Sequence, residues 1–194
     1  SFCKNPKSFL IGNELIFSVL DKKIPNSIVV SIDGLLSIPN FNINQKIINL
    51  TERLKNITED RILIQTRNPE NKTLEAISSG NVLSVCRNDI KERKIFGYPP
   101  FKRLIKLSFE GTAKETEMLK KFLEKELGEY EPQIFSAFAG KKKGFYITNT
   151  ILKINTEKWP LIESLNKKID DKLLSVLYSL PPSFSFFFDP EDLI

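Results

Sequence analysis

Apolar residues along the chain recur at two spacings, and these predict alternating strands and helices. In the first half, a β-branched run at 28–32 predicts a buried strand, and the alternating residues 61–66 predict another. Between them, isoleucine and leucine residues at helical spacing predict a helix over about 42–56. Helical character resumes from 73 to about 95 and is interrupted at Gly80.

The second half predicts the order β-α-β-β-α-β. Thr112 is a suitable N-cap for the first of its helices, and Gly128 a suitable stop. This order resembles a split β-α-β, ferredoxin-like sandwich with both helices on one face of a sheet. The expected strands are 102–110, 132–139, 145–155 and 183–188, and the expected helices are 113–128 and 158–179.

The strongest break in the pattern is the segment Gly97-Tyr98-Pro99-Pro100. Two successive prolines fit neither a helix interior nor a central strand. We therefore place a domain boundary just before it, with domains at 1–92 and 93–194. A chain of 194 residues is long enough for two small cores, and the mixture of elements predicts an α/β (α+β) fold class.

Composition excludes several classes of protein. Hydrophobic residues at 41% and charged residues at 27% are typical of a globular protein, and no apolar run approaches the roughly 18 residues that span a bilayer. Without a signal-peptide pattern at the start, a cytoplasmic protein with no membrane partner is expected. The absence of histidine excludes Ser/His and Cys/His nucleophile pairs and histidine-containing metal sites. Cys3 and Cys86 are expected to be free thiols.

Positive charge is concentrated around the proline pair. The net charge is +5, and the stretch 91–106 has six basic residues against Glu92 alone, an excess as large as that of the whole chain. Such side chains are suited to phosphate contacts, and Tyr98, Phe96 or Phe101 to stacking on unpaired bases. The alternative is that Phe96 and Phe101 are core residues and that the charges only solvate a helix end and a strand edge.

Two further groups of residues are candidates for surface contacts. Lys141–Lys143 lie at the expected tip of a hairpin, where they would meet phosphates or serve only as a solubilising turn. Alternation at Phe184, Phe186 and Phe188 predicts a strand with one face in the core, which leaves Phe187 and Trp159 as candidate partner anchors. The carboxylates at 189–192 are expected to form a solvated polar tail.

Three segments, in the right order, resemble the PriA family of bacterial primosomal replication-restart helicases. They are ILIQTRNPE at 62–70, ERKIFGYPPFKRL at 92–104 and DPEDLI at 189–194. The resemblance implies that 1–92 is the remnant of a second, RecA-like helicase lobe, and that 93–194 is the family's C-terminal domain. It also implies a role in DNA replication restart, with forked or single-stranded DNA, single-stranded-DNA-binding protein and primosome components as partners.

The chain also departs from the family pattern. Asn13-Glu14 and Phe17-Ser18-Val19 replace a Thr-Gln and a Lys-Gly, and 50–61 contains no equivalent of the family's Gly-Arg-x-Gly-Arg segment. Loss of an arginine that contacts the transferred phosphoryl group lowers the rate by orders of magnitude. The chain also lacks the phosphate-binding loop G-x-x-x-x-G-K-[ST].

The helicase motifs are therefore expected to be degenerate, with no catalytic residue and no cofactor in this chain. ATP and magnesium belong to the full-length family, and the family's zinc site is not present here. The expected DNA contacts are Arg93, Lys94, Tyr98, Lys102, Arg103, Lys106, Lys141, Lys142 and Lys143, and the expected partner contact is Trp159. The alternative is an interaction or scaffold module whose basic surface meets an acidic protein partner.

Overall fold

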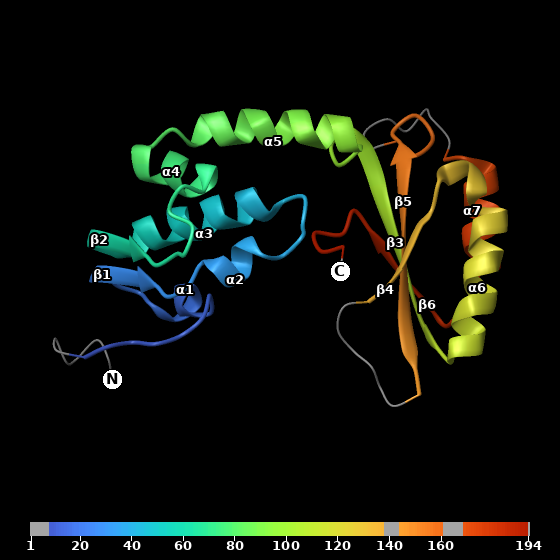
Figure 1. Ribbon diagram of the computed structural model, residues 1–194, viewed down its shortest axis with the longest axis horizontal. Coiled ribbons are helices and arrows are strands. Elements are labelled where there is room, and N and C mark those ends of the chain that lie inside the picture. The colour runs from blue at the N-terminus through green and yellow to red at the C-terminus, as the bar shows by residue number, and fades with distance from the viewer. Residues whose placement is uncertain (1–7, 138–143, 161–168, 194) are drawn as a thin grey trace. The chain divides into compact units, whose positions relative to one another are not determined.

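The computed structural model describes residues 8–137, 144–160 and 169–193, and has a mixed α/β fold with two sheets. The chain divides into two compact units, Ser1–Asp89 and Ile90–Ile194. The division falls inside helix α5 (Val82–Phe96). Figure 1 shows the elements of each unit, which are described separately below.

The first unit is built on a pair of parallel strands, β1 (Ile24–Val29) and β2 (Thr58–Ile64). Parallel strands need a crossover connection, and helix α3 (Ile43–Ile57) supplies it. The other helices of this unit are short: α1 (Ile16–Val19), α2 (Asp33–Leu36) and α4 (Lys72–Ser79), followed by the first part of α5.

Apolar residues at helical spacing in α3 contribute to the small core of this unit. Ile47 of α3 is fully buried and packs with Ile32, Leu74 and Ile77. The predicted helix at 42–56 is thus confirmed with a shift of one residue. The predicted strand at 28–32 is wrong in its bounds, because β1 ends at Val29 and Ser31 adopts φ 60°, which interrupts the extended backbone.

Local side-chain chemistry sets the ends of α4. The side chain of Asn71 accepts hydrogen bonds from the backbone N–H groups of Thr73 and Leu74, which have no partner within the helix. At the other end, Gly80 adopts φ 76°, a left-handed conformation that favours glycine. The predicted interruption at Gly80 is confirmed.

The second unit has the predicted order of elements. Its sheet has the strand order β4-β5-β3-β6, in which every pair is antiparallel. The elements are β3 (Lys102–Gly111), α6 (Ala113–Glu126), a 3-10 turn (Gly128–Tyr130), β4 (Gln133–Ser136), β5 (Tyr146–Asn155), α7 (Asp171–Ser179) and β6 (Phe184–Phe188).

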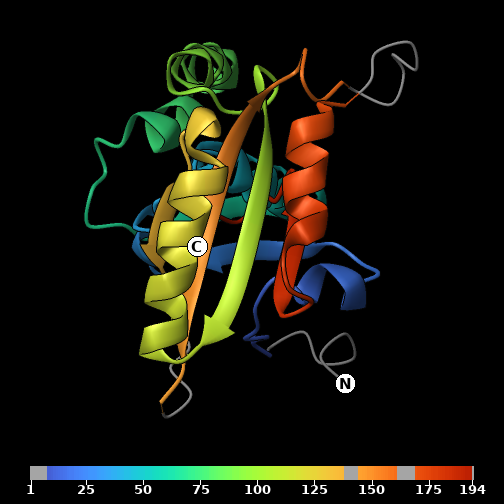
Figure 2. The same ribbon diagram turned by 90° about the vertical axis from the view of Figure 1, so that its right-hand side faces the viewer.

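Helices α6 and α7 cover the same face of this sheet (Figure 2). Leu123 of α6 and Leu173 of α7 are fully buried against Ile105, Leu107 and Leu152 of the two central strands. A capping box sets the start of α6, since Thr112 accepts from the N–H of Glu115 while the Glu115 carboxylate accepts from the N–H of Thr112.

Two predictions for this unit are wrong in part. The helix expected at 158–179 is observed only as α7 from 171, since Lys158 and Trp159 form a turn and Asp170 caps α7; residues 161–168 lie outside the described residues. Only Phe184 of the three alternating phenylalanines is buried, because β6 is an edge strand that pairs with β3 alone. Phe186 is 36% exposed and Phe188 52% exposed.

The structure also bears on the expectations for membrane helices and cysteines. In the described ranges, no helix is long and apolar enough to cross a membrane. Cys86 is an exposed free thiol, as predicted, whereas Cys3 lies outside those ranges.

Candidate nucleic-acid interface

Strand alternation divides the basic residues of β3 between the two faces of the sheet. Arg103 shares its face with Ile105 and Leu107, which pack against the helices. Lys102 and Lys106 lie on the opposite face. Residues 102–110 were predicted as a strand, so the sequence already contained the signal that neighbouring basic residues point apart.

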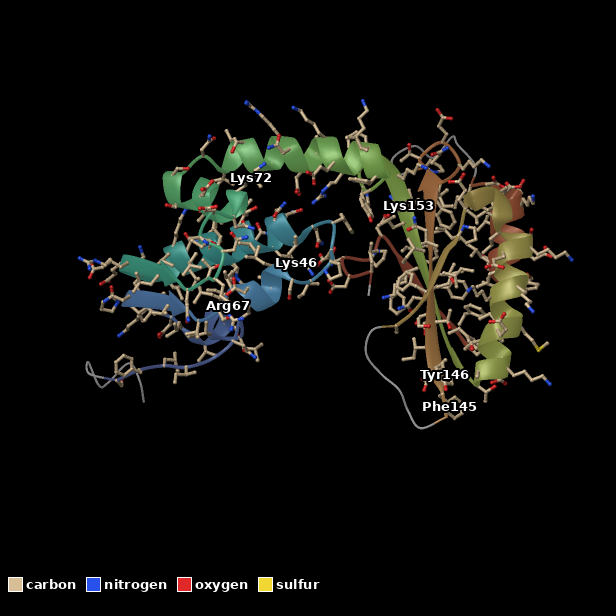
Figure 3. The ribbon with its side chains drawn as sticks, in the orientation of Figure 1. Lys46, Arg67, Lys72, Phe145, Tyr146 and Lys153 are labelled. Carbon is tan, nitrogen blue, oxygen red and sulfur yellow. The ribbon has the colours of Figure 1, made fainter. Side chains whose placement is uncertain are left out.

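The strand register adds a lysine that sequence reasoning missed. Lys153 of β5 is paired with Leu104 of β3, and residues directly opposite each other share a face. Lys102, Lys106 and Lys153 therefore lie on one face, which we call the lysine face. Figure 3 shows Lys153 and Tyr146 toward opposite ends of β5. No pattern in the sequence identifies Lys153, because strand register depends on distant packing.

The turn before β3 packs against two of these lysines. Gly97 has φ 63°, and a Cβ atom at this position would lie 3.0 Å from Cδ of Lys102. The Nζ atom of Lys153 lies 4.0 Å from the centre of the Tyr98 ring and donates a hydrogen bond of 2.9 Å to the carbonyl of Phe96. The turn thus contacts both lysines: Tyr98 makes a cation–π contact with Lys153, and the aliphatic stem of Lys102 packs beside Gly97.

The lysine face is unfavourable for positive charge. Burial lowers the pKa of Lys153, and the nearby charge of Lys102 lowers it further. Burial also lowers the pKa of Lys106, an effect that the carboxylate of Asp192 partly offsets. An anion placed on this face would relieve both the burial cost and the repulsion between ammonium groups.

Arg103 is engaged on the other face. Its Nη2 atom lies 2.8 Å from Oδ2 of Asp189, whose Oδ1 atom accepts a hydrogen bond of 3.0 Å from the N–H of Leu104. The side chain of Arg103 is only 21% exposed. Arg103 therefore attaches the C-terminal segment to β3 through Asp189, a contact that the prediction of a solvated tail did not include, although Asp189, Glu191 and Asp192 are exposed as predicted.

The remaining residues of the basic cluster are dispersed. Arg93 is partly buried and Lys94 exposed in the last turn of α5. Phe96 is 59% exposed and Phe101 36% exposed, so the alternative that they are core residues is wrong. The predicted contacts of Lys141, Lys142 and Lys143 lie outside the described residues.

Trp159, the expected partner contact, packs within its own unit. Its ring stacks on Phe188 at a centroid distance of 5.4 Å and contacts the core between the sheet and the helices. The neighbouring Lys158 lies 3.5 Å from both Glu129 and Asp170, which stabilises the turn before α7. This placement favours a packing role for Trp159 over a role as an anchor for a partner.

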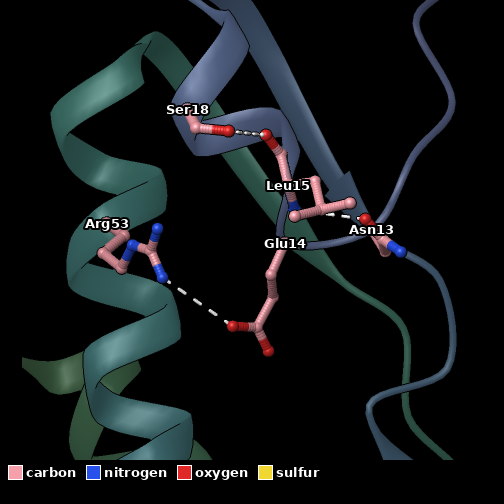
Figure 4. Close-up of a pocket in the computed structure, with 5 residues that line it drawn as sticks. All are labelled: Asn13, Glu14, Leu15, Ser18 and Arg53. Carbon is pink, nitrogen blue, oxygen red and sulfur yellow. Dashed lines mark hydrogen bonds and ion pairs between the residues drawn. The ribbon is translucent and has the colours of Figure 1, made fainter.

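The first unit contains an open hollow of about 500 Å³ lined by Asn13, Glu14, Leu15, Ser18 and Arg53 (Figure 4). Arg53 belongs to the stretch 50–61, which contains no Gly-Arg pair. Its guanidinium lies 3.7 Å from the carboxylate of Glu14 and 4.1 Å from the centre of the Phe17 ring. The arginine of this hollow is thus engaged within the chain, and Glu14 adds negative charge that disfavours a phosphate.

No protein-family model matches the chain. It is 27% identical over 156 residues to the replication restart protein PriA of Thermotoga maritima, a match that covers 74% of this chain and 20% of that protein. It is 28% identical over 137 residues to PriA of Chlamydia trachomatis, with 65% of this chain and 18% of the relative covered. PriA of Chlamydia muridarum is 28% identical over 120 residues, with 59% and 16% covered. The chain therefore spans about a fifth of the length of these relatives.

Proposed function

We propose that this chain, which its three matches support as a part-length protein of the PriA family, acts in DNA replication restart by binding branched or single-stranded DNA. The observation that carries the proposal is the similarity to proteins named for replication restart over 59% to 74% of the chain. The same similarity implies contacts with primosome components, and we propose single-stranded-DNA-binding protein as a further partner. This role implies a cytoplasmic location.

The arrangement of elements supports a finer description of each unit. Two parallel strands joined through α3 are what a remnant of a RecA-like helicase lobe would retain. The order β-α-β-β-α-β, with the sheet order β4-β5-β3-β6 and both helices on one face, supports a ferredoxin-like C-terminal domain. We propose these two assignments as the architecture of the chain.

We further propose that this part of the protein performs no ATP hydrolysis. Phosphoryl transfer requires positive groups held against the transferred phosphoryl group. The sequence at 50–61 lacks the Gly-Arg pairs, and Arg53 is already paired with Glu14. ATP and magnesium chemistry would then belong to the full-length relatives.

Fluorescence anisotropy with the full chain tests the DNA proposal. The ligands are a labelled forked DNA, a single strand, a duplex and a labelled polyglutamate peptide. Binding to DNA should weaken steeply with salt, because neutralising phosphates releases condensed counterions. DNA binding that is tighter than peptide binding supports the proposal, whereas binding only to the peptide would favour the scaffold alternative.

The charge-reversal variants Lys102→Glu and Arg103→Glu make a matched pair in this assay. They are neighbours in sequence but lie on opposite faces of the sheet, and Arg103 is paired with Asp189. Lys102→Glu should weaken DNA binding more than Arg103→Glu in variants that remain folded. If both variants bind DNA as tightly as the parent chain, neither residue belongs to the interface.

A further inference from the structure

The lysine face continues into an exposed aromatic residue on the edge strand. In the pairing of β3 with β6, Phe187 is directly opposite Lys106, so both side chains lie on the face away from α6 and α7. Phe187 is 48% exposed. Its neighbours Phe186 and Phe188 point to the other face, where Phe188 stacks on Trp159.

We propose that the lysine face binds the phosphates of single-stranded DNA while Phe187 stacks on an unpaired base. The inference rests on the proposed function and specifies both the surface and the state of the DNA. It moves the interface from the region around the proline pair to one face of the sheet. Lys153 and Phe187 become part of that interface, and Arg103 is excluded from it.

Charge and spacing indicate an extended polyanion. Lys102 and Lys106 are four residues apart on β3, which corresponds to about 13 Å along a strand. The lysines therefore form a track along the strands, and a single small anion could not reach all of them. The charge of Asp192 raises the pKa of Lys106, so a phosphate bound at Lys106 would compete with this carboxylate.

The aromatic residue favours a single strand over a duplex. The faces of bases in a duplex are stacked on one another and are not available to a side chain, whereas unpaired bases stack on exposed aromatic rings beside basic residues. On the face away from the helices, Leu104 and Ile151 are buried, so the surface open to a base is at the edge strand, where Phe187 is 48% exposed.

The first test removes the charge of the lysine face from the full chain. Lys102, Lys106 and Lys153 are changed together to glutamine, and the control changes three exposed lysines of α6, Lys114, Lys120 and Lys125, in the same way. The probe is a fluorescein-labelled oligo(dT) of about 16 nucleotides. Both triple variants lose the same charge, so a difference between them reports position alone.

Three phosphate contacts to a single strand contribute a slope of about −2 to log K against log salt concentration. This corresponds to about twentyfold weaker binding when salt rises from about 50 to about 200 mM. In the lysine-face variant, the slope of log K against log salt concentration should become less steep by about 2. The α6 variant should keep the slope of the parent chain. The indole fluorescence and the unfolding midpoint of each variant check that it is folded.

The second test separates stacking from charge. Phe187→Leu keeps an apolar side chain but removes the aromatic ring, and should weaken oligo(dT) binding by about tenfold without changing the affinity for a duplex of equal length. Phe187→Tyr keeps the ring and should retain the affinity. Equal loss of single-strand and duplex binding in the leucine variant would contradict base stacking.

The outcomes distinguish this inference from the proposed function. If the parent chain binds DNA and the lysine-face variant binds with an unchanged salt slope, this surface is wrong and the replication-restart proposal stands. If the parent chain binds no DNA, both fail. If it binds duplex more tightly than oligo(dT), DNA binding stands and the single-strand inference is overturned.

Discussion

The carboxylate of Asp189 connects the end of the chain to the central strand β3. One oxygen accepts from the N–H of Leu104 at 3.0 Å, and the other lies 2.8 Å from Nη2 of Arg103. A hydrogen bond to a charged group contributes about 1.5–3 kcal/mol. Solvent screens the ion pair, because the two side chains are 21% and 35% exposed, and this reduces its share to about 0.5–1 kcal/mol.

Asp189→Ala should therefore lower the unfolding free energy of the second unit by about 2–3 kcal/mol. Part of this loss is conformational, since residue 189 has φ 45°, which alanine tolerates poorly. Asp189→Asn should cost only about 1 kcal/mol, because the amide oxygen can still accept from Leu104 and asparagine tolerates this φ. In a unit of about 100 residues, a loss of 2 kcal/mol lowers the melting temperature by roughly 10 °C.

Trp159 provides the assay. It is the one tryptophan of the chain, and it stacks on Phe188, the residue before Asp189. Urea titration followed by its fluorescence therefore reports the second unit, and Glu124→Ala, at an exposed position of α6, serves as a control expected to stay within about 0.5 kcal/mol. An Asp189→Ala variant as stable as this control would refute the structural role assigned to the carboxylate.

Three other expectations follow from local geometry and can be measured by the same urea titration. Gly97→Ala should lower stability by about 1–2 kcal/mol, since φ is 63° and the new Cβ would lie 3.0 Å from Cδ of Lys102; an unchanged midpoint would contradict this. Thr112→Ala removes the N-cap of α6 and should cost about 1 kcal/mol, whereas Thr112→Ser should be nearly neutral. The pKa of Asp170 lies below its ordinary value of 3.8 in the folded state, chiefly because the N–H of Leu173 donates to the carboxylate. Its contribution to stability is therefore present above the unfolded pKa and is lost as the pH falls through the folded value, so Asp170→Asn should show a shallower loss of stability between about pH 5 and pH 2 than the parent chain.

The sequence by itself determined the elements that depend on local signals. The spacing of apolar residues located α3, β3 and β5 to within a residue, and Thr112 and Gly80 marked helix ends through hydrogen bonding and left-handed backbone geometry. Neighbouring residues alone decide these features, so a linear pattern suffices to predict them.

Apolar spacing predicted the start of the last helix incorrectly, at residue 158. The apolar spacing from 162 to 176 suggested one long helix, yet α7 begins at Asp171, where the Asp170 side chain accepts from the N–H groups of Lys172 and Leu173. Asp170 is a strong N-cap that could have been recognised in the sequence.

Tertiary structure alone decided which residues form the candidate interface. Alternation along β3 separates Lys102 from Arg103, but only the pairing with β5 brings Lys153 to the same face, and only the packing of α6 and α7 determines which face remains without them. The edge position of β6 exposes Phe187, and the fold of the C-terminal segment pairs Arg103 with Asp189. These outcomes join residues that are far apart in the chain, and strand register and helix packing are set by the whole core, so no local pattern contains them.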